Sequence, residues 1–442
     1  MTTATSPSAR RGRAATPDLG GRDRVDAVAL ALWAVVVAAA VVWGRSLGAE
    51  RVLVDWPPLH ALWEPGIGLP VLLPVGVATL VVGTRRLQDR VAWRWLLALA
   101  LVAAFAWLVA ANMWRGGGLD RLAAPLGSPQ DYQGDLASFS GPLDTLAHYT
   151  ERLPLLGTHN RGHPPGPLIA FEVLRALGIV DLRAVAILVC LAGASVVVPV
   201  AAVLRRVGGE DRARRLLPLL VLAPYVLWLG VSFDSVFCAA AAWTAFLWLH
   251  ASRSRRLLQA ATGVCFGVML MLSYGLAPFA LVLLSLRRDR RSVCLAAGGV
   301  AAVLVAAWAA GFAWPAGLAA TNVEYQATYH LQGGRPGWYW WLGDLGALAI
   351  ATGPAVALSA GRAIRGLRLR DPGITPWAPT LAAAVAVAFM VVSGLTKAEV
   401  ERIWLPYMPW LLLAAPADRR GILSSVQASW TLTISALVLP WW

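Results

Sequence analysis

Long apolar runs, separated by short polar stretches, dominate the chain from Val25 onward. Each run has the length of a helix, and about 20 apolar residues carry one helix across a bilayer core. The runs do not alternate apolar and polar positions, as the strands of a membrane β-barrel do. The pattern therefore predicts an all-α polytopic membrane protein.

The runs predict about 13 transmembrane helices, several of them short. Four parts follow from them: a disordered basic cytosolic tail (1–24), an N-terminal transmembrane pair (25–94), a transmembrane core (95–416) and a C-terminal transmembrane helix (417–442). The predicted spans are 25–43, 69–83, 95–113, 182–204, 216–231, 235–250, 257–273, 276–286, 293–312, 341–360, 377–393, 404–415 and 422–439.

Composition agrees with this class. Hydrophobic residues make up 58% of the 442 residues and charged residues 14%, whereas soluble domains are nearer half and a quarter. The net charge of +14 comes almost entirely from Arg, because Lys397 is the single lysine. Arg clusters follow alternate apolar runs, which is the pattern of cytosolic loops rather than of nucleic-acid binding. We therefore expect a cytosolic N-terminus and large external loops at 114–181 and 313–340.

Acids and histidines concentrate in the first external loop. Asp131 and Asp135 follow a predicted span, and a carboxylate placed there can take a proton from an incoming hydroxyl if its surroundings tune it. An ordinary solvated loop acid is the competing interpretation for each. The loop also contains Asp144, Glu151, His148, His159, Arg161 and His163.

The segment THNRGHPPGP places His159, Arg161 and His163 at alternate positions before three prolines. Proline is favoured in the first turn of a helix, so residues 166–177 are predicted to form a short helix. That helix is too short to span and is expected to lie at the external interface. The prolines disfavour a helical pair of metal-binding histidines here.

Asp234 lies between two strongly apolar runs. An acid close to membrane depth is costly and is functional by default, although Asp is also a good cap for the helix that follows. In the second external loop, aromatic residues fit either an interfacial belt or a sugar-stacking surface. The candidates there are Tyr325, His330, Arg335 and the cluster from Trp338 to Trp341.

Lys397 and Arg402 stand beside Glu399 and Glu401 at the mouth of a predicted span. Two cations there suit a phosphate or pyrophosphate group. Charge pairing at a helix end, or snorkelling to the interface, is the alternative. The four cysteines form no CxxC pair or spaced metal set, so we interpret them as small apolar residues.

Together these motifs resemble the C-type (GT-C) integral-membrane glycosyltransferases, which include the protein O-mannosyltransferases, the aminoarabinose transferase of lipid A and many actinobacterial envelope enzymes. The resemblance covers about Trp95 to Pro409, with the first two spans as an extension. It rests on an acid in the first core loop, an HPPL-like motif at His163, a second external acid at Asp234, and an R-Y-L-L-P-x-x-P-like motif from Arg402 to Pro409. Gly166 replaces an apolar residue of the HPPL motif, and the adjacent Asp-Glu pair of many members is missing.

The resemblance implies an inverting glycosyltransferase in the plasma membrane with its active site on the external face. The donor would be a polyprenyl-phosphate sugar and the acceptor an envelope glycan, a lipid or a protein. Asp131, or Asp135, would be the base, and Asp234 would position acceptor, donor or base. Arg402, with Lys397 or Arg161, would neutralise the leaving phosphate. A divalent cation, if one is used, would be held by Asp131 and Asp234, while the metal itself stays unassigned.

Three alternatives remain open. One is an envelope glycan polymerase or ligase, which would rely on Arg and His rather than on a loop acid. Another is a transporter or flippase of a lipid-linked substrate without catalysis, which predicts inverted repeats and polar residues at the bilayer midplane. The third is an assembly scaffold, because loop acids need not be catalytic.

Overall fold

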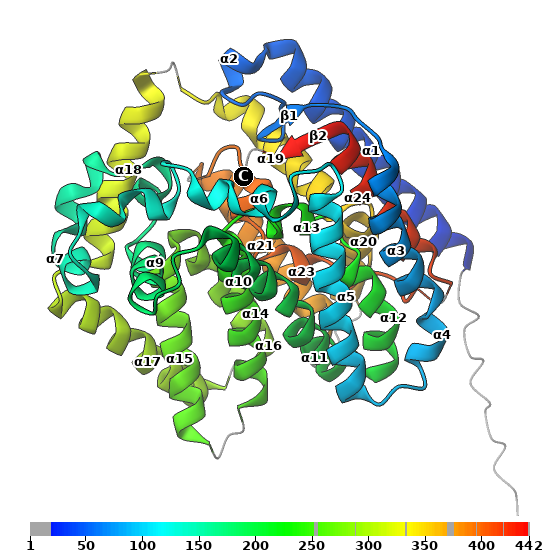
Figure 1. The fold of residues 1–442 in the computed structure, drawn as a ribbon. Coiled ribbons are helices and arrows are strands. Elements are labelled where there is room, and N and C mark those ends of the chain that lie inside the picture. The colour runs from blue at the N-terminus through cyan, green and yellow to red at the C-terminus, as the bar shows by residue number, and fades with distance from the viewer. Residues whose placement is uncertain are drawn as a thin grey trace, which may run out of the picture.

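The computed structural model describes residues 19–251, 255–287, 289–331, 334–368, 375–394, 396–418 and 420–440. Within these ranges the protein is all-α apart from one short two-stranded pair (Figure 1). The predicted tail lies outside the described residues up to residue 18, and residues 19–24 belong to the first helix.

The elements fall into four groups along the chain. The N-terminal group comprises α1 (Leu19–Leu47), α2 (Ala49–Val52), β1 (Ala61–Trp63), η1 (Leu69–Val71), α3 (Leu72–Gly83), α4 (Arg85–Gln88) and α5 (Trp93–Met113). The predicted first external loop folds into short helices: α6 (Gly118–Ala123), η2 (Pro125–Gly127), η3 (Tyr132–Ser138), α7 (Pro142–Arg152), η4 (Leu153–Leu155), α8 (Thr158–Arg161) and α9 (Gly166–Ala176).

The remaining elements form most of the predicted core. The third group is α10 (Leu182–Ser195), α11 (Val197–Gly208), α12 (Glu210–Val221), α13 (Val226–Leu229), α14 (Asp234–His250), α15 (Arg256–Leu272), η5 (Tyr274–Phe279), α16 (Ala280–Leu286) and α17 (Arg290–Ala309). The fourth is α18 (Trp314–Leu331), α19 (Gly337–Thr352), α20 (Ala355–Arg368), α21 (Trp377–Ser393), α22 (Val400–Ile403), α23 (Met408–Leu411), α24 (Ile422–Leu437) and β2 (Val438–Pro440).

Several helices are long and apolar enough to cross a membrane. Among the described residues these are Arg24–Leu47, Trp93–Met113, Leu182–Gly208 and Arg290–Ala309, and the bent pair α19–α20 makes a fifth if it counts as one span. Five apolar helices are shorter: Leu69–Gly83, Arg256–Leu272, Tyr274–Leu286, Trp377–Ser393 and Ile422–Leu437. The composition and the helices together indicate a membrane protein.

Helix α1 shows the membrane character most clearly. Its large apolar side chains Val28, Leu32, Val35 and Val42 are all exposed in the isolated chain. A soluble monomer seldom leaves so continuous an apolar face uncovered. Hydrocarbon is the solvent that this face of α1 fits.

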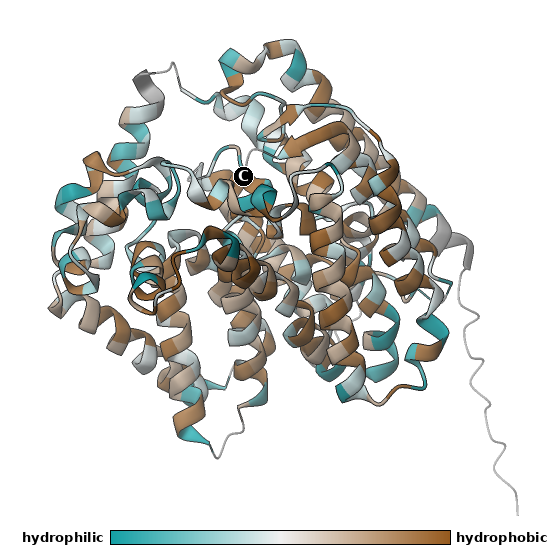
Figure 2. Cartoon of the chain, in the orientation of Figure 1, coloured by the Kyte–Doolittle hydropathy of each residue, from teal (hydrophilic) through white to brown (hydrophobic). Residues whose placement is uncertain are grey.

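Elements of the predicted external segments and the basic turns lie in different halves of the molecule. In Figure 1, α2, β1, β2, α6 and α18 lie in the upper half of the molecule, while α4 and the starts of α12 and α15 lie in the lower half. Hydrophobic residues dominate most of the helices between the two ends (Figure 2). The β1–β2 pair, α6 and α18 thus lie toward one end of the molecule, and the basic turns at α4 and before α12 and α15 lie toward the other.

Small residues let α15 and α17 approach closely. A Cβ on Gly263 would lie 1.9 Å from the backbone oxygen of Ala296, and one on Gly299 would lie 2.3 Å from that of Ala260. Only glycine permits this backbone contact, and small residues at helix interfaces are the usual device in membrane bundles, where apolar burial gains little.

Three predicted spans are broken. The run 216–231 is divided at Pro224 into α12 and α13, and the run 404–415, which holds Pro406 and Pro409, contains only the single turn α23. The run 341–360 bends by 105° between α19 and α20, at Gly353, whose φ is +69°, and Pro354. Proline removes a helical hydrogen bond and glycine tolerates positive φ, which explains each break.

The segment 313–340, expected as a loop, is largely the helix α18. By contrast, the short helix predicted at 166–177 is present as α9. Gly166, the departure from the family-like motif, lies against the end of α15, where a Cβ would be 2.2 Å from the backbone oxygen of Met271. An apolar side chain cannot occupy this position without moving α9.

The N-terminal pair is not a separate appendage. Helix α1 packs along α19 and α20, and β1 pairs antiparallel with β2, with Ala61 opposite Pro440 and Trp63 opposite Val438. The connection from residue 48 to residue 68 thereby lies over the predicted core, where it contributes to the site described next.

Candidate functional site

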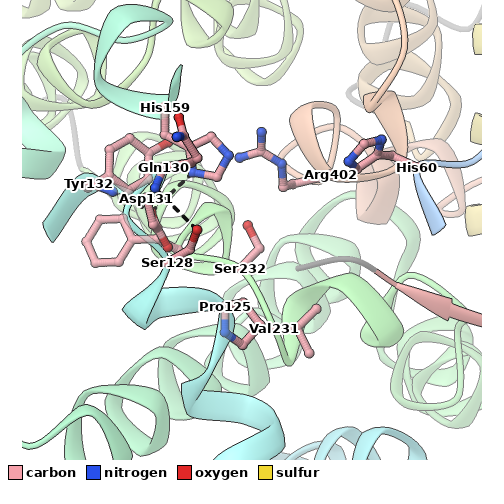
Figure 3. Close-up of a pocket in the computed structure, with 11 residues that line it drawn as sticks. His60, Pro125, Ser128, Gln130, Asp131, Tyr132, His159, Val231, Ser232 and Arg402 are labelled. Atoms are coloured by element: carbon pink, nitrogen blue, oxygen red, sulfur yellow. Dashed lines mark hydrogen bonds and ion pairs between the residues drawn. The ribbon is translucent and has the colours of Figure 1, made fainter. Parts of the chain in front are cut away.

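A cavity of about 200 Å³ brings together residues that are far apart in the sequence. Its loop side consists of Pro125, Ser128, Gln130, Asp131, Tyr132 and His159, all from the first external loop. Its α22 side consists of Arg402 and His60, and residues 231–233 before α14 form a third wall. Figure 3 shows the Arg402 guanidinium extending from the α22 side toward His159.

Asp131 is buried at the start of η3, where its carboxylate serves as the N-cap. Its Oδ1 accepts hydrogen bonds from the Tyr132 backbone N–H at 2.6 Å and from His159 Nδ1 at 3.2 Å. A carboxylate oxygen accepts, so Nδ1 of His159 carries the proton. No described residue donates to Oδ2, which leaves this oxygen for a ligand in the cavity.

Asp135, the alternative base, has a different position. Its Oδ2 accepts hydrogen bonds from the Gly157 backbone N–H at 2.8 Å and from Asn160 Nδ2 at 2.7 Å. Asn160 is fully buried and also donates to the Tyr132 carbonyl at 2.9 Å. Asp135 thus ties η3 to α8 and does not line the cavity. The geometry distinguishes two acids that the sequence left equivalent.

Asp234 lies behind the cavity and pairs with Arg402. Its Oδ2 accepts from Arg402 Nη1 at 2.8 Å and from the hydroxyl of Ser232, which lines the cavity. Both charged side chains are at most 4% exposed. The N-cap position of α14 belongs to Phe233, so the capping interpretation of Asp234 was wrong. The carboxylate orients Arg402 instead.

The segment that carries Arg402 is held by contacts from distant elements. Ala398 and Glu399 both have positive φ, near +65° and +60°, which L-residues adopt at a cost. The Ala398 N–H donates to Asp344 Oδ1 of α19 at 2.9 Å. Glu399 pairs with Arg335 at 2.9 Å and with Arg402 at 3.2 Å. These arginines hold the pKa of the Glu399 carboxyl far below its usual value, despite its burial.

Glu401 fixes the N-terminal connection to the same segment. Its Oε1 accepts the backbone N–H of His60 at 2.7 Å, and the side chain is fully buried. Burial raises the pKa of Glu401 to about 7. Burial, together with the nearby cations Arg335 and Arg402, lowers the pKa of His60, although Glu399 and Asp55 oppose this. His60 is therefore a neutral imidazole at physiological pH.

Tyr132 and His163 back the loop side of the cavity. Their rings meet edge to face with centroids 5.3 Å apart. His163 Nδ1 donates to the His159 carbonyl at 2.9 Å, and burial lowers the pKa of His163 to about 4. Burial and the nearby Asp234 raise the pKa of Tyr132 well above its usual value. The Tyr132 hydroxyl is buried and has no hydrogen-bond partner in the described ranges.

The other predicted site residues lie outside this cavity. Arg335 acts through Glu399, and Lys397 contributes its carbonyl to Arg335 at 2.6 Å. Trp338 is about half exposed and lies against Trp43, with ring centroids 5.3 Å apart. Arg161 belongs to α8 and Tyr325 to α18. The side chain of His330 lies outside the described residues.

Sequence reasoning missed His60, Ser232 and the role of Glu401. His60 stands in the short stretch WPPLHALW, and it is one of only six histidines in the chain. That scarcity was the available signal, but no sequence pattern links residues 44–68, between two predicted spans, to the later external segments. Its place over the cavity depends on pairing with the far end of the chain.

A divalent cation gains no support from the arrangement of acids. In the described part of the chain, no three His, Cys, Asp or Glu residues gather in a group that could hold one. Asp234 already pairs with Arg402 through Oδ2.

Comparisons with known proteins return no relative: no family model matches the chain, and no curated protein or solved structure matches it either.

Proposed function

We propose that the protein is a membrane glycosyltransferase that moves one sugar from a polyprenyl-phosphate donor to a hydroxyl acceptor of the cell envelope. One observation carries the proposal: a single cavity joins a carboxylate that has a free oxygen with a buried arginine, although their positions are 271 residues apart (402 minus 131). A carboxylate can activate a hydroxyl, and a guanidinium can receive a phosphate. Glycosyl transfer from a phosphate requires both.

The loop side supplies the base. The acceptor hydroxyl gives its proton to Asp131 Oδ2 while its oxygen attacks the anomeric carbon. Oδ1 stays fixed by the Tyr132 N–H and by His159, so the carboxylate keeps its orientation during the transfer. The bond between the anomeric carbon and the phosphate oxygen breaks on the opposite face, and the sugar inverts.

The α22 side receives the leaving phosphate. Arg402 lines the cavity, and Asp234 and Glu399 fix its guanidinium before any substrate arrives. A preorganised donor stabilises developing negative charge without a cost of reorientation. The electron pair of the broken bond ends on the phosphate, which remains on the lipid.

The size of the cavity favours transfer of a single sugar unit. Pockets for drug-sized ligands measure about 300–1,000 Å³, whereas this cavity measures about 200 Å³. One monosaccharide ring is the appropriate scale, and an oligosaccharide is not. This argues against the polymerase or ligase alternative.

The proposed topology has 13 crossings, an N-terminus in the cytosol and the cavity at the external face. The β1–β2 pair and α6, which adjoin residues that line the cavity, lie toward the end opposite the basic turns (Figure 1). Arginine-rich turns remain on the cytosolic side during insertion, which supports this orientation. Actinobacterial plasma membrane is the setting that the Arg- and Ala-rich composition fits.

The test is donor turnover by the full chain in proteoliposomes, with a panel of polyprenyl-phosphate monosaccharides and an envelope extract as the acceptor source. We expect one donor to be consumed, and Asp131→Asn to lower its turnover by roughly 10²–10⁴-fold, the usual contribution of a positioned base. Asp144→Asn is the matched control, because that acid of the same loop lies in the first turn of α7, accepts the Ser140 backbone N–H and does not line the cavity.

Two outcomes would overturn the proposal. Equal turnover by wild type and Asp131→Asn would show that Asp131 is not the base. Movement of an intact lipid-linked sugar between leaflets, without transfer and without dependence on Asp131, would identify a flippase instead.

A further inference from the structure

The N-terminal connection supplies a side chain to the cavity that neither hydropathy nor motif order indicates. His60 lines the cavity on the α22 side, beside Arg402 (Figure 3). It precedes β1 by a single position, and β1 is fixed by its pairing with β2. The backbone that carries the His60 imidazole is thus held in place by the strand pairing that begins at the next residue.

Two contacts fix this connection, one to α22 and one to α19 and Ala398. The fully buried Glu401 accepts the His60 N–H at 2.7 Å. Val52 and Val54, from the same connection, pack with Tyr339, Trp340 and Ala398 in a small buried cluster. Because Glu401 and Arg402 are adjacent on a one-turn helix, the contact that places His60 also fixes its distance from Arg402.

The pair suits a phosphate. Arg402 already has carboxylates at Nη1 and Nη2, so its charge is shared before a ligand arrives. A dianionic or monoanionic phosphate has several acceptor oxygens and needs more than one donor. A neutral imidazole can donate one hydrogen bond without adding the desolvation cost of a second buried charge.

We propose that His60 binds the phosphate of the lipid-linked donor next to Arg402, and that Glu401 is the positioning residue that holds His60 there. This inference rests on the proposed function, whose donor it describes. It makes the N-terminal pair a part of the substrate site rather than an anchor.

The test measures binding of polyprenyl phosphate, the leaving group, to the full chain in nanodiscs, so that no sugar or acceptor has to be known. We expect His60→Ala to weaken binding about tenfold, the scale of one hydrogen bond to a charged group. His60→Gln, which keeps an N–H donor, should recover most of this loss. His250→Ala is the control, since that histidine lies at the other end of α14, outside the cavity.

Polyprenol without phosphate should bind wild type and His60→Ala equally, because the missing partner is the phosphate. Glu401→Ala should weaken polyprenyl-phosphate binding and leave polyprenol binding unchanged, whereas a merely structural defect would weaken both. Equal affinity of wild type and His60→Ala for polyprenyl phosphate would overturn the inference. If a soluble sugar phosphate competes with polyprenyl phosphate as well as unlabelled polyprenyl phosphate does, the site does not recognise the lipid, and that part of the inference would be overturned.

The two proposals fail in different ways. Binding that depends on His60, in a protein that turns over no donor, would keep the phosphate site and reject glycosyl transfer. Turnover that persists in His60→Ala with an unchanged affinity for polyprenyl phosphate would keep glycosyl transfer and reject the role of His60.

Discussion

The loop side and the α22 side of the cavity are built in opposite ways. On the loop side, Asp131 is held by its own neighbour Tyr132 and by His159, and Asp135 closes the same loop through Gly157 and Asn160. On the α22 side, the segment around Arg402 depends on Asp234, Arg335, Asp344 and His60, which come from three separate regions of the chain: α14, α19 with the residues just before it, and the N-terminal connection.

The two sides differ in how far apart in the sequence the residues lie that hold each side chain in place. A local network is complete once about thirty residues of loop have folded, whereas the α22 side exists only when these three regions have met α22. Its two residues of positive φ show that the backbone itself is held in a costly shape by those partners. A substitution on the loop side should therefore disturb only neighbouring residues, whereas a substitution on the α22 side should destabilise the packing of several elements.

The largest effect is expected for Arg402→Met. It leaves Asp234 buried without its cation, and breaking a buried pair costs about 3–5 kcal/mol. The free energy of unfolding in mixed micelles should fall by that amount, and donor turnover should be lost. Adding Asp234→Asn should restore part of the stability but no activity. A single variant as stable as wild type would show that the pair does not hold the α22 side.

The next effect is a pH dependence of stability carried by Glu401. Its pKa rises from 4.5 to about 7 on folding, so the folded state binds more protons than the unfolded state between these values. The contribution of Glu401 is complete below pH 4.5 and is lost as pH rises through about 7, a change of roughly 3 kcal/mol.

The measurement is the difference between wild type and Glu401→Gln, since His163 and His60, with lowered pKa values, give the opposite slope and cancel in that difference. We expect the variant to gain stability relative to wild type from pH 4.5 to 7. A constant difference across this range would contradict the raised pKa.

A smaller and strictly local effect is expected for Asp135→Asn. The neutral amide oxygen accepts the two hydrogen bonds that Asp135 Oδ2 receives more weakly than the carboxylate does, which costs roughly 1–3 kcal/mol because hydrogen bonds to a charged group are the stronger ones. Turnover per folded molecule should remain near that of wild type, unlike that of Asp131→Asn. If Asp135→Asn instead abolishes turnover in a fully folded protein, the base is Asp135 and the assignment is reversed.

The smallest effect on stability is expected for Asp120→Asn, which serves as a reference for the other variants. Asp120 and Arg183 form an exposed pair at 2.6 Å on the loop side. Exposed pairs contribute little because water and salt screen them. Asp120→Asn should leave the unfolding midpoint unchanged, measured under the same conditions as the other variants. A shift comparable to that of Asp135→Asn would mean that the loop as a whole, and not its buried bonds, is the sensitive element.

The sequence predicted the two sides unequally, for the same physical reason. Apolar periodicity identified the helix class, and turn chemistry identified α9, because both depend on neighbouring residues. Asp131, His159, Asp234 and Arg402 were selected by type and order. The choice between Asp131 and Asp135 required the fold, because it depends on which carboxylate Gly157 and Asn160 reach. His60 and Glu401 could not be paired from the sequence, since their contact spans 341 residues.

The antiparallel pairing of β1 with β2 also determines when the site can exist. During synthesis, residues 61–63 emerge long before residues 438–440, so the wall that carries His60 waits for α24 and β2. A nascent chain halted before α24 has Asp131 and Arg402 but lacks the partner strand of β1. The wall of the cavity that carries His60 is therefore completed only after β2 has been made, long after the loop side has been synthesised.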